Sequence, residues 1–398
     1  MDIVKVKLES GETLPMLLDY QGLPVVAPCE WIISRRHRSL NTLSRNLQEL
    51  TPLYNWLEEK GEDLFKLIRS SRYWTEVFVS SLVECLRRTQ RQEMKLVKLV
   101  VRPDTTNKRI STVLRYLNWC FDVVLGEREL GEMRRAAIKE EREKVNKWLQ
   151  QAYISPEPPR KGVKKGLTLT QARFLQDVLD PSISKPVRHS SNICLRNFLI
   201  VGLMLLYGLR PGEVLSLRMR DIEFGALSNV NVCRRRPSAE DPRSRPASVK
   251  RAGRVLVLDN TRFAKLLDEY AMNIRERAVR RQNRKRSSFF FLSRNGLPLS
   301  ESSVQAIFKQ LRKVYPENLP SNLTAKSLRH TFTDNVYRAL RGQGIPSDET
   351  RSILMYFRGD TGRESQDVYI DYQGLAKEAM RSYWLKVAGS TVIEDVPV

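Results

Sequence analysis

An almost unbroken apolar run from Phe198 to Leu209 constrains the fold of this chain more than any other feature. Such a segment is hydrophobic on every side of a helix, which predicts a helix buried in a core, and it falls short of the roughly 18 residues of a membrane-spanning helix. Gly208 predicts that this helix ends or bends, and Pro211 is favoured in the first turn of a following helix. Arg210 is therefore predicted at a junction of two helices, beside an apolar core.

Apolar residues at helical spacing predict helices along most of the remaining chain. Extended runs predict a small β-sheet, and residues 3–8 alternate weakly, as in a short strand or an ordered arm. The connection 234–251 between two of the extended runs is so polar and proline-rich that we expect it to be mobile and unpacked. The predicted helices are one from Ser39, with Ser39 or Asn41 as its cap, then Trp74–Thr89, Asn107–Val124, Gly131–Tyr153 (with Glu140 paired to Lys144), Leu169–Leu179, Asn192–Tyr207, Asn273–Arg286 and one from Ser302; the extended runs are Val230–Cys233, Val255–Leu258 and Phe289–Leu292, the last followed by a turn at Asn295-Gly296.

The charge balance points to a polyanionic partner. Lys and Arg number 68 against 45 Asp and Glu, a formal net charge of +23, and an excess of this size repels itself unless a polyanion neutralises it. Nucleic acid is the first candidate and an anionic membrane surface the second. The scattered arginines lack the apolar face that a membrane-surface helix needs, and an aromatic stacking signature for RNA is not evident.

Cysteine and histidine usage argues against a disulfide framework and a metal centre. The five cysteines are scattered and form no Cys-x-x-Cys pair, and the chain has three histidines. Such a pattern is typical of reduced cysteines in a cytosolic protein, and the N-terminus lacks the apolar core of a secretion signal. We therefore expect a cytoplasmic, nucleoid-associated protein without a cofactor, a bound metal or a membrane partner.

Three segments carry candidate chemistry: LLYGLRPGEVLSLRMRDI with Arg210, KSLRHTF with Lys326 and Arg329, and RGDTGRESQDVY with Asp360 and Tyr369. Taken singly, each has a plain structural explanation. The first is explained by a helix-end arginine bonded to Glu213 or Asp221, the second by a salt-bridged surface helix, and the third by a tyrosine in a core or at its rim. Their order along the chain is what points to function.

In this order, the segments resemble the catalytic domain of the tyrosine recombinase (phage integrase) family over roughly residues 165–390. The resemblance places Arg210 and Arg329 as the two catalytic arginines and selects Tyr369, rather than Tyr372, as the nucleophile. The stretch VKRAGRVLVLD is similar to the family's β-hairpin and gives Lys250 the role of the catalytic lysine. The helical N-terminal part is similar to the family's core-binding domain, though by its helices and not by a signature.

Two positions depart from the family pattern. Lys326 stands where the family usually has histidine, three residues before the second arginine, and still supplies a donor and a positive charge. Asp360 stands where the family usually has His or Trp. Its carboxylate would repel a phosphate, unless it orients an arginine or accepts the tyrosine proton. The departures bear on the rate and on proton management more than on the type of reaction.

The resemblance implies a mainly α fold with a small antiparallel β-sheet, in an α+β catalytic domain, plus an all-α N-terminal DNA-binding domain. Together the two domains would form a clamp around duplex DNA. The expected divisions are an arm at 1–26, a core-binding domain at 27–154, a basic linker at 155–166, a catalytic domain at 167–390 and a tail at 391–398. The amphipathic segment after Tyr369, GLAKEAMRSYWLKVA, would dock on a neighbouring protomer by helix exchange. Packing on its own protomer is the alternative.

The implied activity is site-specific recombination, in which DNA is cut and rejoined through a 3′-phosphotyrosine without metal or ATP. The partners would be double-stranded DNA and other copies of the chain, as a tetramer, because joining two duplexes needs four strand cuts. A type IB topoisomerase and a non-catalytic DNA-binding protein on the same fold are the alternatives. The sequence does not specify the recombination site, accessory proteins, or the choice between integration, excision, resolution and transposition.

Overall fold

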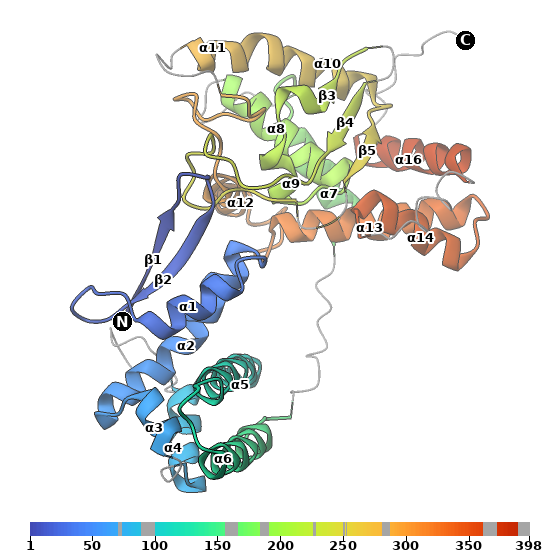
Figure 1. Cartoon of the computed structure of the whole chain (residues 1–398). Helices are drawn as coiled ribbons and strands as arrows, with labels where there is room; N and C mark the ends of the chain where they lie inside the picture. The colour runs from blue at the N-terminus through green and yellow to red at the C-terminus, as the bar shows by residue number, and fades with distance from the viewer. Residues whose placement is uncertain are drawn as a thin grey trace. The chain divides into compact units, whose positions relative to one another are not determined.

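A computed structural model of the chain describes residues 1–70, 74–88, 100–155, 166–183, 191–225, 228–249, 251, 253–280, 287–360 and 372–388. The chain divides into two compact units, Met1–Lys161 (unit 1) and Gly162–Val398 (unit 2). Each unit has its own hydrophobic core. Figure 1 draws unit 1 in blue to teal and unit 2 in green to red.

The described residues of unit 1 form six helices and a two-stranded hairpin (Figure 1). Strands β1 (Asp2–Lys7) and β2 (Thr13–Leu18) pair antiparallel, and β2 packs on the first two helices, burying Leu17 completely. The hairpin lies within the first 26 residues, where a short strand or an ordered arm was expected, and the elements described from Val26 to Gln151 are helices, as predicted. The helices are α1 (Val26–Ser34), α2 (Leu40–Lys60), α3 (Leu64–Ser70), α4 (Glu76–Arg87), α5 (Pro103–Leu125) and α6 (Glu132–Gln151).

Local sequence signals explain the helices of unit 1. Ser39 caps α2, since its hydroxyl accepts the N–H of Thr42 at 3.3 Å, and Gly61 ends that helix in the left-handed conformation at φ 67°. The predicted pair of Glu140 and Lys144 forms on α6 at 2.6 Å. The helices α1 and α3 were not predicted, since both are short.

Unit 2 is built around the predicted buried helix, α8 (Ser191–Leu206). Helices α7 (Leu169–Leu179), α9 (Pro211–Ser216), α10 (Thr261–Glu269) and α13 (Ala325–Gly342) pack against it. A three-stranded antiparallel sheet, in the order β3 (Ile222–Glu223), β4 (Asn229–Val232) and β5 (Arg254–Val257), accompanies these helices. The remaining elements are the short η1 (Met219–Asp221), the π-helical η2 (Tyr270–Arg275), α11 (Glu276–Arg280), α12 (Glu301–Val314), α14 (Ser347–Arg358) and α16 (Gln373–Ala388) (Figure 1).

Two element predictions in unit 2 are wrong. Phe289–Leu292 forms no strand; it makes isolated bridges, from Phe289 to Arg218 and from Leu292 to Pro298. The arginine-rich helix begins at Thr261 rather than Asn273, as one helical stretch made of α10, η2 and α11, and residues 281–286 lie outside the described part. The mainly helical fold with a small antiparallel sheet is confirmed.

The connection between β4 and β5 also differs from its prediction. Its described part has no helix or strand, but its middle is packed because Arg243 is buried and bonded on several sides. The Arg243 guanidinium donates to the Asp241 carboxylate at 2.8 Å and to the carbonyls of Leu215 at 3.0 Å and Leu299 at 2.9 Å. It also lies over the Phe289 ring, 4.6 Å from the centroid. This polar segment can pack because the buried charge of Arg243 is paired with a carboxylate and bonded to backbone carbonyls.

Candidate active site

The junction after α8 places Arg210 in the interior of unit 2. The chain turns at Gly208, whose φ is +67°, and a Cβ there would lie 2.5 Å from Cδ1 of Phe332 on α13. Only glycine fits this close approach, which brings the end of α8 against α13. Pro211 then begins α9, as predicted, with Arg210 as its N-cap residue.

Glu213 anchors two arginines from the first turn of α9. Its carboxylate accepts the backbone N–H and the Nη1 of Arg210, both at 3.0 Å, and the Nη2 of Arg254 on β5, also at 3.0 Å. The Glu213 side chain is fully buried. Burial raises the pKa of its carboxyl, but the charge and hydrogen bond of Arg254, together with Arg210, outweigh burial, and the pKa lies below its ordinary value. A charged Glu213 therefore ties α9 to β5.

Arg329 meets Arg210 at the end of α14. Arg329 lies in the first turns of α13, where its neighbours Leu328 and Phe332 are fully buried, as their spacing predicts. Its Nη1 donates to the Gly208 carbonyl at 2.7 Å and its Nη2 to the Arg358 carbonyl at 2.8 Å. Arg210 Nη1 donates to that same Arg358 carbonyl at 2.9 Å. One backbone oxygen therefore holds both predicted catalytic arginines.

The Asp360 carboxylate bridges three arginines. One oxygen accepts the Nη2 of Arg210 in a short bond, and the other accepts the Nη2 of Arg329 at 3.2 Å and pairs with the Nη2 of Arg358 at 3.0 Å. Gly359, in the left-handed conformation at φ 61°, ends α14 and turns the chain so that Asp360 faces this cluster. Asp360 thus contacts the arginines directly, one of the two roles that the sequence left open for it.

Neighbouring charges and burial have opposite effects on the pKa of Asp360. Burial raises the pKa of Asp360, but the hydrogen bond and charge of Arg210, with the charges of Arg329 and Arg358, lower it below its ordinary value. Burial and the neighbouring charge of Arg210 lower the pKa of Arg329 to about 10. Asp360 and Arg329 are therefore both charged at neutral pH, and the arginines form a positive site suited to a phosphate.

The other predicted site residues are placed less fully. Lys326 is exposed and lies three residues before Arg329 on α13. Lys250 and Tyr369 lie outside the described residues, as do 156–165 of the predicted linker. Tyr372, the rejected alternative, is half-buried just before α16 and packs against the core of unit 2.

Both chain segments that flank Lys250 are fixed to α9. A Cβ on Gly212 would lie 2.8 Å from the Ser248 carbonyl oxygen, so the chain two residues before Lys250 contacts α9 at a glycine. Four residues after Lys250, Arg254 is paired with Glu213. The described residues on both sides of Lys250 therefore contact α9, the helix that Arg210 caps.

Sequence reasoning missed Arg254 and Arg358 as members of this cluster. Arg254 is almost fully buried, with 1% of its side chain exposed, and it pairs with Glu213 on α9. Arg358 contributes both its carbonyl and its guanidinium. The one available signal for Arg254 was the presence of an arginine beside the apolar residues of the predicted strand. Nothing in the spacing around 358 distinguishes it from an ordinary helix-end arginine.

The α16 helix packs within its own unit. It contacts α7 and α13, and its buried residues, Ala376, Ala379, Met380, Tyr383, Trp384 and Val387, belong to the core. Tyr383 and Trp384 donate to the carbonyls of Leu205 at 2.7 Å and Leu206 at 3.0 Å, which are otherwise free at the end of α8. Leu375 and Leu385, on the same helix, are exposed.

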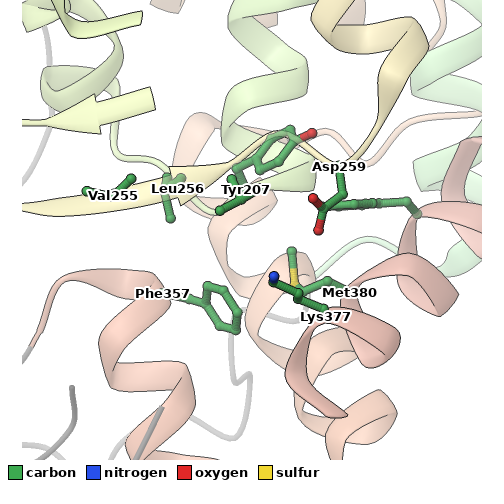
Figure 2. Close-up of a pocket in the computed structure, with 9 residues that line it drawn as sticks. Tyr207, Val255, Leu256, Asp259, Phe357, Lys377 and Met380 are labelled. Carbon is green, nitrogen blue, oxygen red and sulfur yellow. The ribbon is translucent and has the colours of Figure 1, made fainter. Parts of the chain in front are cut away.

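A pocket opens along the seam between α16, β5 and α14. Figure 2 shows Val255 and Leu256 on one side, Phe357 below them, and Lys377 and Met380 on α16 facing Asp259. Its lining includes neither Arg210 nor Arg329. This pocket is therefore separate from the arginine cluster, and it provides no group that fits phosphate chemistry other than Lys377.

Within the described part of the chain, no group of three or more His, Cys, Asp or Glu side chains is arranged to hold a metal ion. The described helices include none that is both long and apolar enough to cross a membrane.

The fold and the cluster together define a class: a helical domain with a small antiparallel sheet, in which two arginines from distant helices converge on one anion-binding position. Residues 182–343 match the model of the phage integrase family. This part of the chain therefore carries a phage integrase domain, the resemblance that the order of the arginine segments predicted.

Solved structures similar to this chain include two DNA complexes. One is the XerH site-specific recombinase bound to its difH substrate, with 14% identity over 89% of this chain and 88% of that chain and a TM-score of 0.48. Another is the Tn1549 transposon integrase with transposon right end DNA, with 16% identity over 82% of this chain and 98% of that chain and a TM-score of 0.37. No curated protein matches the chain by sequence.

Proposed function

We propose that this chain is a site-specific recombinase that cuts DNA with Tyr369 as its nucleophile, and that Arg210 and Arg329 hold the scissile phosphate. The observation that carries the proposal is the convergence of these two arginines, 119 residues apart in the numbering (329 − 210), on one position. Two guanidinium groups neutralise the charge that develops on the non-bridging oxygens in the transition state.

The strand transfer balances without an external reagent. The Tyr369 oxygen forms a bond to phosphorus, the bond from phosphorus to the 5′ oxygen breaks, and the tyrosine proton passes to water. Lys250 gives a proton to the departing 5′ oxygen, the role that the family resemblance implies for it. The described residues Ser248 and Arg254 on either side of it both contact α9. The 3′-phosphotyrosine keeps the energy of the broken bond, so a 5′ hydroxyl of a partner strand reseals it without ATP. Exposed Lys326 adds positive charge on the same helix as Arg329.

The wider arrangement follows from the same proposal. The helical core-binding domain (27–154) and the catalytic domain (167–390), joined by the basic linker 155–166, would enclose duplex DNA, with phosphate contacts supplying most of the affinity. Four strand cuts require a tetramer on two duplexes. Because α16 packs within its own unit, exchange with a neighbour would require this helix to leave the seat formed by α7, α8 and α13. We expect the protein to be cytoplasmic and associated with the nucleoid.

The test is covalent adduct formation with nicked or phosphorothiolate-containing DNA from the ends of the protein's own genetic element. The native chain and the matched Tyr372→Phe variant should give an adduct that resists denaturant on a gel, and Tyr369→Phe should give none. An adduct in Tyr369→Phe that is lost in Tyr372→Phe would move the nucleophile. Tight binding without an adduct in any of the three would favour a non-catalytic DNA-binding protein, and relaxation of DNA without partner exchange would favour a topoisomerase.

A further inference from the structure

The acceptors around Arg210 and Arg329 divide into two kinds. Four of the hydrogen bonds, to the Glu213 carboxylate, to the Gly208 carbonyl and two to the Arg358 carbonyl, go to a fully buried carboxylate or to backbone oxygens. These bonds fix each guanidinium from the protein side. The remaining acceptor is Asp360, whose side chain is 20% exposed.

Asp360 makes the contacts that a phosphodiester would make. A carboxylate offers two oxygens, and here one takes the Nη2 of Arg210 while the other takes the Nη2 of Arg329. A phosphodiester likewise offers two non-bridging oxygens that pair with arginine forks. The carboxylate therefore bridges the two arginines in the manner expected of the substrate.

The Asp360 carboxylate and a bound phosphate repel each other, so their simultaneous presence at this position is disfavoured. Two negative groups bonded to the same guanidinium nitrogen lie within a few Å of each other, where their repulsion is strong in a partly buried site. Asp360 has a third partner, because Arg358 Nη2 lies 3.0 Å from the oxygen that also accepts Arg329. The Arg358 side chain is 36% exposed. If Asp360 moves away from Arg210 and Arg329, it therefore keeps Arg358 as a cationic partner.

We propose that Asp360 is an internal placeholder for the DNA phosphate. Its carboxylate holds Arg210 and Arg329 in position in the DNA-free protein, and a phosphate group displaces it toward Arg358. This inference rests on the proposed function, since it takes the same two arginines as the phosphate site. Asp360 is then a positioning residue whose negative charge opposes phosphate binding.

The experiment measures the binding of inorganic phosphate through thermal unfolding at constant ionic strength, with chloride as the balancing anion. Phosphate stabilises the folded protein in proportion to its occupancy. Asp360→Asn keeps the side-chain shape and removes the charge. It should lower the phosphate concentration needed for a given rise in Tm by about tenfold, the order expected for removing a like charge a few Å away.

Matched controls separate this site from general attraction to a basic protein. Asp348→Asn makes the same charge change on the exposed start of α14, where Asp348 pairs with Arg351, and should leave phosphate binding unchanged. Adding Arg329→Gln to Asp360→Asn should abolish the gain, because the phosphate then loses half of its clamp. Equal gains in Asp360→Asn and Asp348→Asn, or persistence of the gain in the double variant, would overturn the proposal.

A folded Asp360→Asn that binds phosphate as weakly as the native chain, or more weakly, would also overturn it and would show that Asp360 stays in place as a fixed support. If Asp360→Asn does not fold, Asp360→His tests the same point, since it too removes the negative charge. The assay uses neither DNA nor cutting. Failure of the placeholder is therefore distinguishable from failure of Tyr369 to form an adduct.

Discussion

At the scale of single residues, Gly208 determines how close α8 comes to α13. Its φ of +67° strains any residue with a Cβ, and that Cβ would meet the Phe332 ring. We expect Gly208→Ala to lower the free energy of unfolding by about 2–4 kcal/mol, from the backbone conformation and the overpacking together.

Urea denaturation followed by circular dichroism measures this loss. Gly342→Ala is the matched control, because no atom lies within 4 Å of a Cβ at that position and its φ is not positive. The control should be neutral or slightly stabilising. Equal stability of the two variants would contradict the role given to Gly208.

Glu141 is a buried carboxyl on α6 whose protonation should control the stability of unit 1. Burial raises its pKa from 4.5 to about 7, offset in part by a hydrogen bond from the Trp74 backbone. The folded state therefore binds a proton that the unfolded state releases, so this group stabilises below pH 4.5 and loses that contribution as the pH rises to about 7. Above pH 7 the charged carboxylate costs on the order of 2–3 kcal/mol.

The Glu141→Gln variant removes this dependence. It should be more stable than the native chain at pH 8 and similar to it at pH 4, as measured by Tm across that range. Glu140→Gln, which removes the exposed partner of Lys144, is the control and should show no gain at high pH. A Glu141→Gln gain that does not vary with pH would refute the assigned cause.

At the scale of elements, the β4–β5 connection depends on one buried arginine. Arg243 joins the connection to the end of α9 and to the chain before α12, and Ser248 of the same connection lies against Gly212. This segment leads directly to Lys250. We therefore expect the anchor on Arg243 to affect both the stability of unit 2 and the activity that depends on the predicted general acid.

We expect Arg243→Met to lower the free energy of unfolding by about 3–5 kcal/mol, because it removes the guanidinium that pairs with the buried Asp241 carboxylate. Adduct formation should slow as well. Denaturation and single-turnover cleavage measure the two effects, with exposed Arg245→Met as the control. If the native rate persists in a destabilised Arg243→Met, the connection does not position Lys250.

At the scale of the whole molecule, the formal charge of +23 should govern how the proposed DNA substrate is bound. Each phosphate neutralised by Lys or Arg releases counterions, so the affinity falls as salt rises. If the chain contacts about 6–10 phosphates, its affinity should fall by about 10³–10⁵ between 50 and 200 mM salt. Fluorescence anisotropy with the native and a scrambled site measures this. A flat salt response would rule out a mainly electrostatic interface.

Several features follow from sequence alone because they depend on neighbouring residues. The burial of α8, its end at Gly208, the start of α9 at Pro211 and the anchors Leu328 and Phe332 each arise from local apolar spacing or backbone preference. The order of the arginine segments indicated the family, and the bond of Arg210 to Glu213 was expected as its ordinary structural contact. Lys250 and Tyr369 remain predictions.

Only the tertiary structure decided which charges meet. Arg210 and Asp360 are separated by 150 positions, Arg254 and Glu213 by 41, and Arg243 and Leu299 by 56. A charge pattern along a chain does not specify such pairs, because an exposed arginine and a buried one look the same in sequence. Their partners are determined when α8, α13 and α14 pack, since burying a charge requires a counter-charge or a carbonyl at the place where the packing leaves it.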